Sequence, residues 1–445
     1  MQFGFRANHS TEIANCVLSE MIKSHLDKNT YVGAVFLDLK KAFDTVNHQV
    51  LMAKLSHFNF SVDALFWFQS YLSNRTQCVT IDGIKSTHLG NPAGVPQGSI
   101  LGPLLFSLYI NDLPDICPSL NVQMYADDAV IFTEGKNAET IAAKLTSGLL
   151  EVKSWLSDTC LTLNTKKTVC MMFSKKPKKL IRSHVFYDGT ELELVPHFKY
   201  LGVVLDSTLS FKKHIKKVAN TIKFSIQNFK QIRPFITAGA AKSYLHCMIL
   251  SHIEYCLPVW SITGTTILHP IKLLYKRAIK VFDRKPLSYH HCTILEKYHL
   301  LSFNNFRLFK SLCLIYKCLN GLAPPPLRQF VTRRNNKVKT RAATRGDCQI
   351  QTRKYSLPQN TWSIRGSTSW NKLPLPLRES PSLNSFKRKL KIWLKINQHC
   401  QHKPEAPNKF YTGTLYRLIP AIIEESSAIF RSVCPFYYFT YLTVI

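Results

Sequence analysis

The stretch VQMYADDAVIF (residues 122–132) places two adjacent aspartates, Asp127 and Asp128, inside an apolar run. The apolar segments on either side predict the two strands of a tight hairpin, with the acidic pair at its turn. Adjacent like charges repel each other, and burying an unpaired carboxylate costs free energy or shifts its pKa. A divalent cation such as Mg²⁺, which prefers oxygen ligands and substrate phosphates, would remove that cost. The pair therefore indicates metal-dependent phosphoryl chemistry, and an exposed Asp-Asp turn without a ligand is the alternative.

A third aspartate, Asp38, supplies a partner from another segment. It lies in the run YVGAVFLDL (residues 31–39), whose β-branched and apolar residues predict a buried strand. Two-metal phosphoryl transfer needs carboxylates from separate segments around ions about 3.5–4 Å apart. Because neighbouring residues on an extended strand face opposite ways, we expect Asp127 to bind metal more directly than Asp128. Asp44, six residues after Asp38, is predicted to cap a helix or form a salt bridge.

The segment GVPQGS (residues 94–99) predicts a turn-rich loop. Glycine lets the backbone approach a substrate closely, and the Gln97 side chain can both donate and accept hydrogen bonds. Ser99 is predicted to cap the helix that follows, which extends to about Asn111. Taken alone, this loop is weak evidence for a binding site.

The alternation of strands and helices predicts an α+β sheet domain up to about Asp206. In that domain the expected helices are 42–55, 62–72 and 138–156, and further expected strands are 77–81, 168–173 and 198–205. Beyond it the pattern becomes helical, with expected helices at 211–229, 238–249, 273–282, 303–319 and 382–397. A basic loop is expected at 332–345.

Charge divides the chain into two contrasting halves. Of 58 Lys and Arg and 27 Asp and Glu, residues 1–206 hold 19 of each, which leaves 39 basic and 8 acidic residues for 207–445. The whole excess of +31 therefore lies in the second half. A neutral half with acidic clusters and a strongly basic half are typical of a catalytic part and a part that binds nucleic acid.

The 13 cysteines form no Cys-x-x-Cys pair, which favours a reduced intracellular protein of the nucleus or cytoplasm, not a secreted one. His399, Cys400 and His402 lack a second ligand pair, so a zinc site is not favoured. The N-terminus shows no signal peptide. The apolar segment 432–445 is too short to span a bilayer comfortably, so we expect no membrane association.

Together these segments resemble the motifs of reverse transcriptases. The segments VFLDLKKAFD (35–44), GVPQGSILGP (94–103) and YADD (125–128) resemble motifs A, B and C, in the family's order. LNTKKT (163–168) resembles motif D, FKYLGV (198–203) resembles motif E, and QFGFR (2–6) followed by Ser10 and Thr11 resembles a fingers motif. The variety is similar to that of jockey-like non-LTR retrotransposons. WNKLP (370–374) and SFK (385–387) resemble the C-terminal region of such elements, so the resemblance covers roughly residues 2–397.

The resemblance implies an RNA-directed DNA polymerase that uses two Mg²⁺ ions, an RNA template, a DNA primer and dNTPs. It implies that the metal ligands and catalytic residues are Asp38, Asp127 and Asp128. It also implies that Phe43 blocks a ribose 2′-hydroxyl, and that the incoming nucleotide or its phosphates are contacted by Gln97, Gly98, Arg6 and Lys167. Alternatively, Phe43 is a core aromatic residue, and Arg6 and Lys167 are surface charges.

The family's arrangement divides the chain into partial fingers and palm (1–206), a helical thumb or connection (207–330), a basic C-terminal region (331–400) and a tail of unassigned role (401–445). In this arrangement one thumb helix would hold the template–primer backbone through Lys212, Lys213, Lys216 and Lys217. No protein partner is indicated.

Family members carry fingers strands and an endonuclease upstream of the position of Gln2, so the resemblance predicts an N-terminally truncated chain. Two alternatives stay open. One is a catalytically inactive, nucleic-acid-binding protein derived from a decayed element. The other is an RNA-dependent RNA polymerase, against which Phe43 argues, because that family usually places a polar residue at this position.

Overall fold

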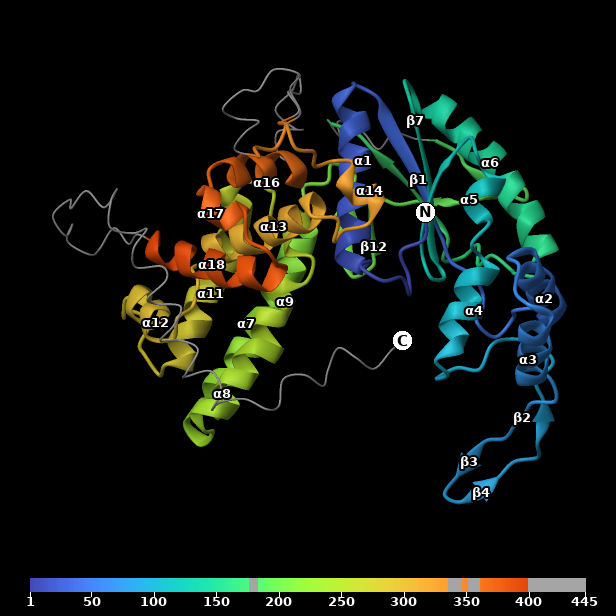
Figure 1. The fold of residues 1–445 in the computed structure, drawn as a ribbon, viewed down its shortest axis with the longest axis horizontal. Helices are drawn as coiled ribbons and strands as arrows, with labels where there is room; N and C mark the ends of the chain where they lie inside the picture. Colours follow the sequence, from blue (N-terminus) through green and yellow to red (C-terminus); the bar gives the residue numbers. More distant parts are fainter. Residues whose placement is uncertain (176–182, 335–345, 351–360, 399–445) are drawn as a thin grey trace. The chain divides into compact units, whose positions relative to one another are not determined.

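The computed structural model describes residues 1–175, 183–334, 346–350 and 361–398, of which residues 1–396 belong to one compact unit (Figure 1). Its main sheet has five strands, and β1 runs antiparallel to both β7 and β8. The strand order is β11 (Glu193–Leu194), β8 (Val169–Phe173), β1 (Tyr31–Leu37), β7 (Asp128–Gly135) and β6 (Asn121–Tyr125). The predicted strand at 31–39, the hairpin and the strand at 168–173 are thus confirmed.

Helices cover both faces of this sheet. The α1 helix (Thr11–Asp27) lies on one face and α6 (Ala138–Asp158) on the other. Along β1, Ala34 and Phe36 belong to the hydrophobic cluster that includes α1, whereas Val35 and Leu37 belong to the cluster that includes α6. Both faces of the strand are therefore buried, which explains why the sequence shows a continuous apolar run instead of an alternating one.

The strand predicted at 198–205 is instead a separate two-stranded hairpin, β12 (His197–Tyr200) and β13 (Val203–Asp206), which packs against the main sheet. The Phe198 ring stacks on Phe36 of β1, with 4.5 Å between ring centroids. The fully buried Gln123 of β6 donates from Nε2 to the Tyr200 hydroxyl at 3.1 Å. The hairpin thus contacts the strand that leads to Asp38 and the strand that leads to Asp127.

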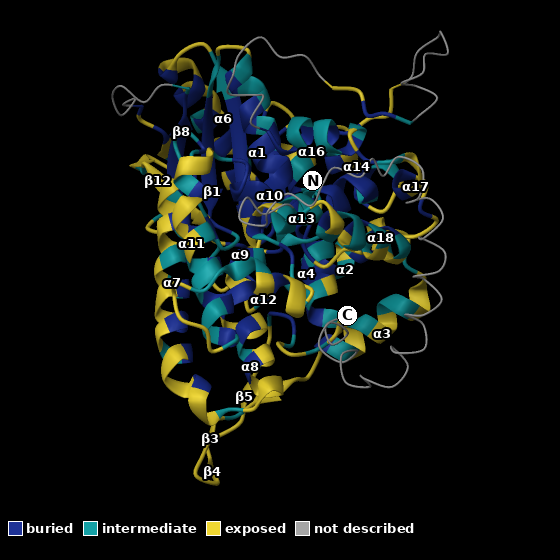
Figure 2. Ribbon diagram, turned by 90° about the vertical axis from the view of Figure 1, so that its left-hand side faces the viewer, coloured by how far each residue is buried: buried dark blue, intermediate teal, exposed yellow. Residues whose placement is uncertain are grey.

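Beyond residue 206 the described chain is helical (Figure 2). The longest of these helices, α7 (Lys212–Ile232), buries Ile215, Val218, Ile222 and Ile226 and exposes its opposite face. The others are η1 (Arg233–Phe235), α8 (Ala238–Tyr244), the π-helical turn η2 (Leu245–Leu250), α9 (Ser251–Glu254), α10 (Leu257–Trp260), α11 (Thr265–Phe282), α12 (His291–Lys297), α13 (Phe303–Leu319), α14 (Pro325–Arg328), α16 (Trp362–Asn371), α17 (Leu375–Arg378) and α18 (Leu383–Ile396). The helices predicted at 238–249 and 273–282 fall within longer helical stretches.

The helix predicted at 42–55 is wrong at its start. It begins at His48 as α2 (His48–His57), because Lys41 has a φ of 47° and opens a turn. In that turn the Asp44 nitrogen donates to the Lys41 oxygen at 2.8 Å. Asn47 caps the helix, since its side chain accepts from the Val50 nitrogen at 3.1 Å. Periodicity alone cannot distinguish such a turn from the first helical turn.

The single strand predicted at 77–81 is also wrong. Two short strands occur there, β2 (Thr76–Gln77) and β3 (Thr80–Ile81), and they pair with β5 (Leu89–Gly90) and β4 (Ile84–Lys85). Asp82 and Gly83 form the turn between β3 and β4, with φ values of 50° and 83°. This arm has no buried face, so no alternating pattern marks it.

The remaining elements of the first half are α3 (Val62–Leu72), which has the predicted bounds, α4 (Leu101–Tyr109), α5 (Leu113–Ile116), β9 (Phe186–Tyr187) and β10 (Thr190–Glu191). The cysteines of the described ranges are free thiols. No helix in those ranges is long and apolar enough to cross a membrane. The residues weighed for zinc (399, 400 and 402), the apolar tail and most of the basic stretch at 332–345 lie outside the described residues.

Candidate active site

The β6–β7 hairpin places the two adjacent aspartates at one end of the sheet. Tyr125 pairs with Asp128, and Ala126, with a φ of 53°, forms the turn together with Asp127. Both aspartates reach solvent, while Ala126 and Ala129 on either side are buried. Asp127 lies in the turn and not on an extended strand. The alternation of side chains along a strand therefore gives no reason to expect that Asp127 binds metal more directly than Asp128.

Strand pairing brings Asp38 to the same end of the sheet. Leu37 of β1 pairs with Ala129 of β7, so the next step along the register brings Asp38 level with Asp128. The Asp38 backbone is held on its other side by the loop after α6, whose Asn164 nitrogen donates to the Asp38 oxygen at 2.7 Å. The Asp38 nitrogen also donates to Thr168 Oγ1 at 3.2 Å. The predicted approach of the three aspartates therefore follows from the sheet register.

The carboxylates interact electrostatically. Burial, followed by the charges of Asp127 and Asp38, raises the pKa of Asp128 to about 6. Burial chiefly raises the pKa of Asp127 as well, and the charge of Asp38 adds to this effect. The side chains touch solvent, yet the buried residues around them remove part of their hydration. Three oxygen donors that repel one another suit a hard divalent cation such as Mg²⁺, which would offset the repulsion.

The loop 94–99 docks on the turn that follows Asp38. The Val95 nitrogen donates to the Phe43 oxygen at 2.8 Å, and Gln97 Nε2 donates to Asp44 Oδ1 at 2.7 Å. Gly94 has a φ of 88°, and a Cβ there would lie 2.8 Å from the Asp44 oxygen. The prediction that Asp44 caps a helix or forms a salt bridge is therefore wrong, because its carboxylate holds Gln97 in place.

Phe43, whose backbone accepts from the Val95 nitrogen, also contacts the core through its ring. The Phe43 ring is half-buried and stacks on Phe106 of α4, with 4.3 Å between centroids and 27° between planes. The half-buried Phe43 ring can therefore pack against the core and can also contact a nucleotide. Gly98 has a φ of 80° and open space around the position of a Cβ. Ser99 Oγ accepts from the Gly102 nitrogen at 2.8 Å and so supports the start of α4, although the cap position itself falls on Ile100.

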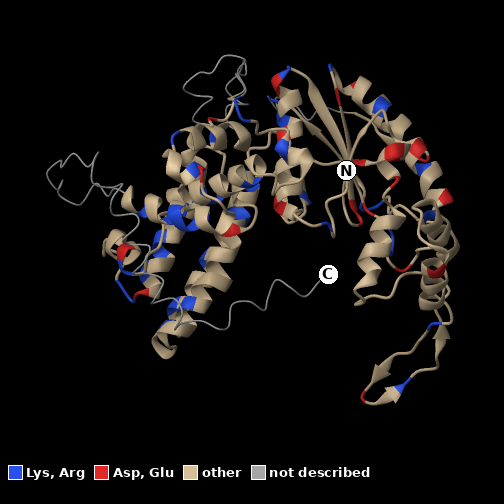
Figure 3. Ribbon diagram, viewed as in Figure 1, with Lys and Arg blue, Asp and Glu red and all other residues tan. Residues whose placement is uncertain are grey.

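Figure 3 shows where lysines and arginines lie along the ribbon. The predicted cationic contacts among them are all exposed. Lys167 lies in the loop whose Asn164 holds the Asp38 backbone, whereas Arg6 lies two residues beyond Gly4. The four lysines of α7, Lys212, Lys213, Lys216 and Lys217, lie on its exposed face, and Lys213 Nζ contacts His197 Nδ1 at 2.9 Å. The contacts of these lysines with nucleic acid, and those of Arg6 and Lys167 with a nucleotide, stay predictions.

Gln2 and Gly4, in the segment that resembles a fingers motif, have a structural role that was not predicted from the sequence. Gln2 is buried, and its Oε1 accepts from the Gly4 nitrogen at 2.7 Å and from the Ala126 nitrogen at 3.1 Å. A Cβ on Gly4 would lie 2.4 Å from the Ala126 nitrogen. This segment therefore braces the aspartate turn, and its Gln-x-Gly pattern was the signal that could have indicated a structural role.

A second group of ligand types, His290, His291 and Cys292, has potential ligand atoms within 4.8 Å of one another. Burial, followed by the charge of Lys276, lowers the pKa of His291 to about 4, and other lysines add to the effect. The nearby lysines oppose a bound cation electrostatically, while the lowered pKa keeps the His291 imidazole neutral.

The chain is similar to a known protein family and to proteins of mobile elements. Residues 1–205 match the family model described as "Reverse transcriptase (RNA-dependent DNA polymerase)". The chain is 30% identical over 301 residues to the "Probable RNA-directed DNA polymerase from transposon BS" of Drosophila melanogaster, with 64% of this chain and 32% of that protein covered. It is 28% identical over 296 residues to the "RNA-directed DNA polymerase from mobile element jockey" of the same species, with the same shares covered.

Residues 1–205 therefore match the reverse transcriptase family. Over 64% of its length, the chain is similar to RNA-directed DNA polymerases of mobile elements such as jockey. It spans about a third of the length of these curated relatives, 32% in both cases. Among solved structures it is similar to apo telomerase from Candida tropicalis, with a TM-score of 0.37, 14% identity and coverage of 69% of this chain and 49% of that one.

Proposed function

We propose that this chain is an RNA-directed DNA polymerase that joins dNTPs to the 3′-hydroxyl of a DNA primer on an RNA template. The observation that carries the proposal is the approach of Asp38, Asp127 and Asp128 at one end of the sheet, with the pKa of Asp128 raised to about 6. Such a carboxylate cluster suits two Mg²⁺ ions, and these three residues would hold them. When bound, the ions would activate the hydroxyl and neutralise charge on the leaving pyrophosphate.

In this proposal the loop 94–99 and the turn after Asp38 form the nucleotide site. Phe43, supported by Phe106, would lie against the sugar and exclude a 2′-hydroxyl. Gln97, fixed by Asp44, would present its amide to the incoming nucleotide next to Gly98, around which there is open space. Two hydrogen-bonded segments thus hold these groups before substrate binds, which reduces the entropy lost on binding.

The helices after residue 206 would bind the template–primer duplex as a thumb, next to a palm formed by the sheet and to partial fingers. The support is the position of Lys212, Lys213, Lys216 and Lys217 on the exposed face of α7. Contacts of lysines with phosphates set affinity and salt dependence without reading sequence. We also infer that the protein acts inside the cell, in the nucleus or cytoplasm.

Primer extension tests the proposal directly. With a DNA primer on an RNA template, Mg²⁺ and dNTPs, the wild-type chain should extend the primer. Asp127→Ala should bind the duplex but not extend it, and Asp158→Ala, which removes an exposed carboxylate at the end of α6, should extend as the wild type does. If the wild type binds the duplex and makes no product, the activity claim fails.

A non-catalytic RNA-binding protein remains the second candidate, and the basic second half favours it. This alternative predicts salt-sensitive RNA binding that Asp38→Ala leaves unchanged, together with no extension by the wild type. An RNA polymerase would instead incorporate rNTPs in preference to dNTPs. The same assay, run with both nucleotide sets, distinguishes the three functions.

A further inference from the structure

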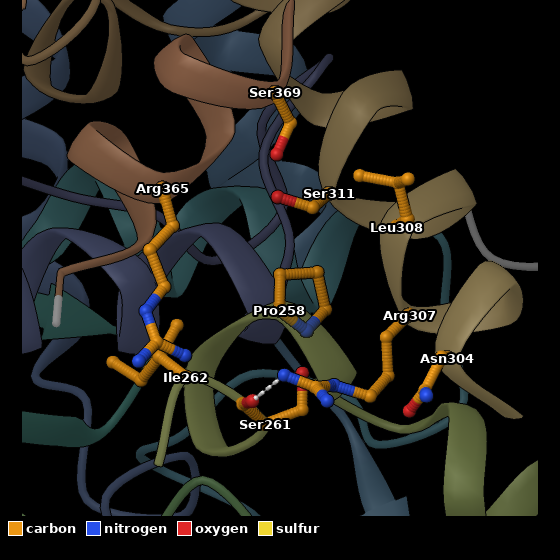
Figure 4. Close-up of a pocket in the computed structure, with 9 residues that line it drawn as sticks. All are labelled: Pro258, Ser261, Ile262, Asn304, Arg307, Leu308, Ser311, Arg365 and Ser369. Atoms are coloured by element: carbon orange, nitrogen blue, oxygen red, sulfur yellow. Dashed lines mark hydrogen bonds between the residues drawn. The ribbon is translucent and has the colours of Figure 1, made fainter. Parts of the chain in front are cut away.

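A pocket of about 170 Å³ lies between α10, α13 and α16, outside the carboxylate site (Figure 4). It is lined mostly by polar and basic side chains, and no carboxylate is among the lining residues that the structure describes. The lining consists of Pro258, Ser261, Ile262, Asn304, Arg307, Leu308, Ser311, Arg365 and Ser369. All of these residues follow residue 205, so the pocket is independent of the polymerase proposal.

Two arginines reach into this pocket from different helices. Figure 4 shows Arg307 of α13 and Arg365 of α16 extending towards the same stretch, Ser261 and Ile262. Arg307 Nη2 donates to the Ser261 oxygen at 2.5 Å. Its Nε is buried and has no hydrogen-bond partner among the described residues. Arg307 as a whole is half-buried, and a buried Nε–H that stays unpaired is costly unless a ligand accepts from it.

Close packing of α16 on α13 fixes the arrangement. A Cβ on Gly366 would lie 2.7 Å from Ile315 Cδ1 and 3.3 Å from Ser311 Oγ. A larger residue there would force the helices apart and move Arg365, the preceding residue, away from Arg307. The pocket is therefore built by tertiary packing and does not depend on flexible surface side chains.

The electrostatics of the pocket favour an anion. Burial, followed by the charge of Arg365, lowers the pKa of Arg307 to about 10, and burial lowers the pKa of Arg365. Both guanidinium groups remain charged at neutral pH, so two like charges face the same small volume. An anion between them would offset the repulsion and the lost hydration. The hydroxyls of Ser311 and Ser369 offer further donors at the other end of the pocket.

We propose that this pocket binds a single phosphate group. Guanidinium forks and hydroxyls are donors that match phosphate oxygens. The volume is well below the roughly 300 Å³ of the smallest usual small-molecule pockets, which excludes a whole nucleotide. The phosphate is either one backbone group of a bound nucleic acid strand or free inorganic phosphate.

Thermal unfolding of the full chain tests the proposal with inorganic phosphate against chloride at equal ionic strength. Phosphate should raise the Tm of the wild type by about 2–4 °C. Arg307→Gln and Arg365→Gln should lose this increase. Arg388→Gln should retain it, because this variant removes an exposed arginine on α18. Ser369→Leu fills the pocket without removing an arginine and should also lose the increase, which keeps the test decisive if an arginine variant does not fold.

A second arm identifies the source of the phosphate. If it is a nucleic acid backbone group, the slope of log K against log salt for single-stranded RNA should fall by about 1 in Arg307→Gln and stay unchanged in Arg388→Gln. An unchanged slope, together with loss of the phosphate-dependent Tm, assigns the site to free phosphate. The proposal is overturned if phosphate and chloride give the wild type the same Tm and no pocket variant changes the RNA slope.

Discussion

Gln2 Oε1 accepts a hydrogen bond from the backbone nitrogen of Ala126 at 3.1 Å, across 124 residues of sequence. Ala126 has a φ of 53°, a conformation that is strained for a residue with a Cβ, and it immediately precedes Asp127. The bond therefore ties the segment near the N-terminus to the turn that carries the aspartates. In the proposed polymerase, Gln2 is a positioning residue for the metal ligands.

Replacing Gln2 with alanine should slow nucleotide incorporation by about 10–100-fold, because a buried N–H left unpaired costs about 1–3 kcal/mol and the turn would relax. Duplex binding should stay within about twofold of wild type, because the α7 lysines are untouched. Pre-steady-state incorporation and duplex titration measure the two quantities. Gln69→Ala, at an exposed glutamine on α3, is the matched control. A loss of incorporation and binding by equal factors would point to general misfolding instead.

Gly94 and Gly98 form a natural pair of substitutions, since both have positive φ (88° and 80°) and only Gly94 packs against the Asp44 backbone. Alanine at either position should cost about 1 kcal/mol of backbone strain. Gly94→Ala should cost a further 1–2 kcal/mol or so, because the loop must move away from Asp44. Urea unfolding of both variants measures the difference. Equal losses would mean that the close approach at Gly94 contributes nothing.

Asp128 should make the metal-free protein less stable as the pH rises from about 4 to 6. Its pKa is raised from 3.8 to about 6 on folding, so within this window the folded state binds more protons than the unfolded state. Asp128→Asn should remove this dependence and stabilise the metal-free protein at pH 7, by at most about 1 kcal/mol because solvent screens the exposed carboxylate. Unfolding curves in a chelator across this pH range measure it, with Asp158→Asn as the control. A variant that shows the wild-type pH dependence would rule out this contribution from Asp128.

Phe43→Val should lower the preference for dNTPs over rNTPs by about tenfold or more, because the proposed barrier to a 2′-hydroxyl is the ring. Phe106→Leu keeps the Phe43 ring but removes its stacking partner, so its effect should be smaller. Single incorporations of matched deoxy- and ribonucleotides give the ratio. If both variants discriminate as the wild type does, Phe43 is a core residue and not a gate.

The sheet and its carboxylates could be predicted because their signals are local. The apolar run 31–39 and the hairpin 122–132 each predict a strand, and the family order of motifs predicts that Asp38 meets Asp127. The long helices were predictable for the same reason, because α3 and α13 have the expected bounds. In each case the signal lies within one segment: an apolar run for the strands and a helical period for the helices.

The supporting contacts could not be predicted, because they join residues far apart in sequence. No pattern pairs Gln2 with Ala126, or Gln97 with Asp44, before the fold brings them together. The turn that replaces the first part of the predicted helix at 42–55 could not be predicted for the same reason. Lys41 has a positive φ there, and the nearby Phe43 oxygen accepts a hydrogen bond from the Val95 nitrogen of a distant loop. Here, tertiary hydrogen bonds override the local helix propensity.

The Mg²⁺ dependence of single-dNTP incorporation on an RNA template tests most directly whether Asp38 and Asp128, 90 positions apart in sequence, act as one centre. The wild type should saturate with Mg²⁺, and Asp38→Asn and Asp128→Asn should each lose at least about 100-fold in rate at saturating dNTP. Asp158→Asn should behave as the wild type. An Asp38→Asn variant that incorporates dNTPs at the wild-type rate, with the wild-type Mg²⁺ dependence, would contradict the account.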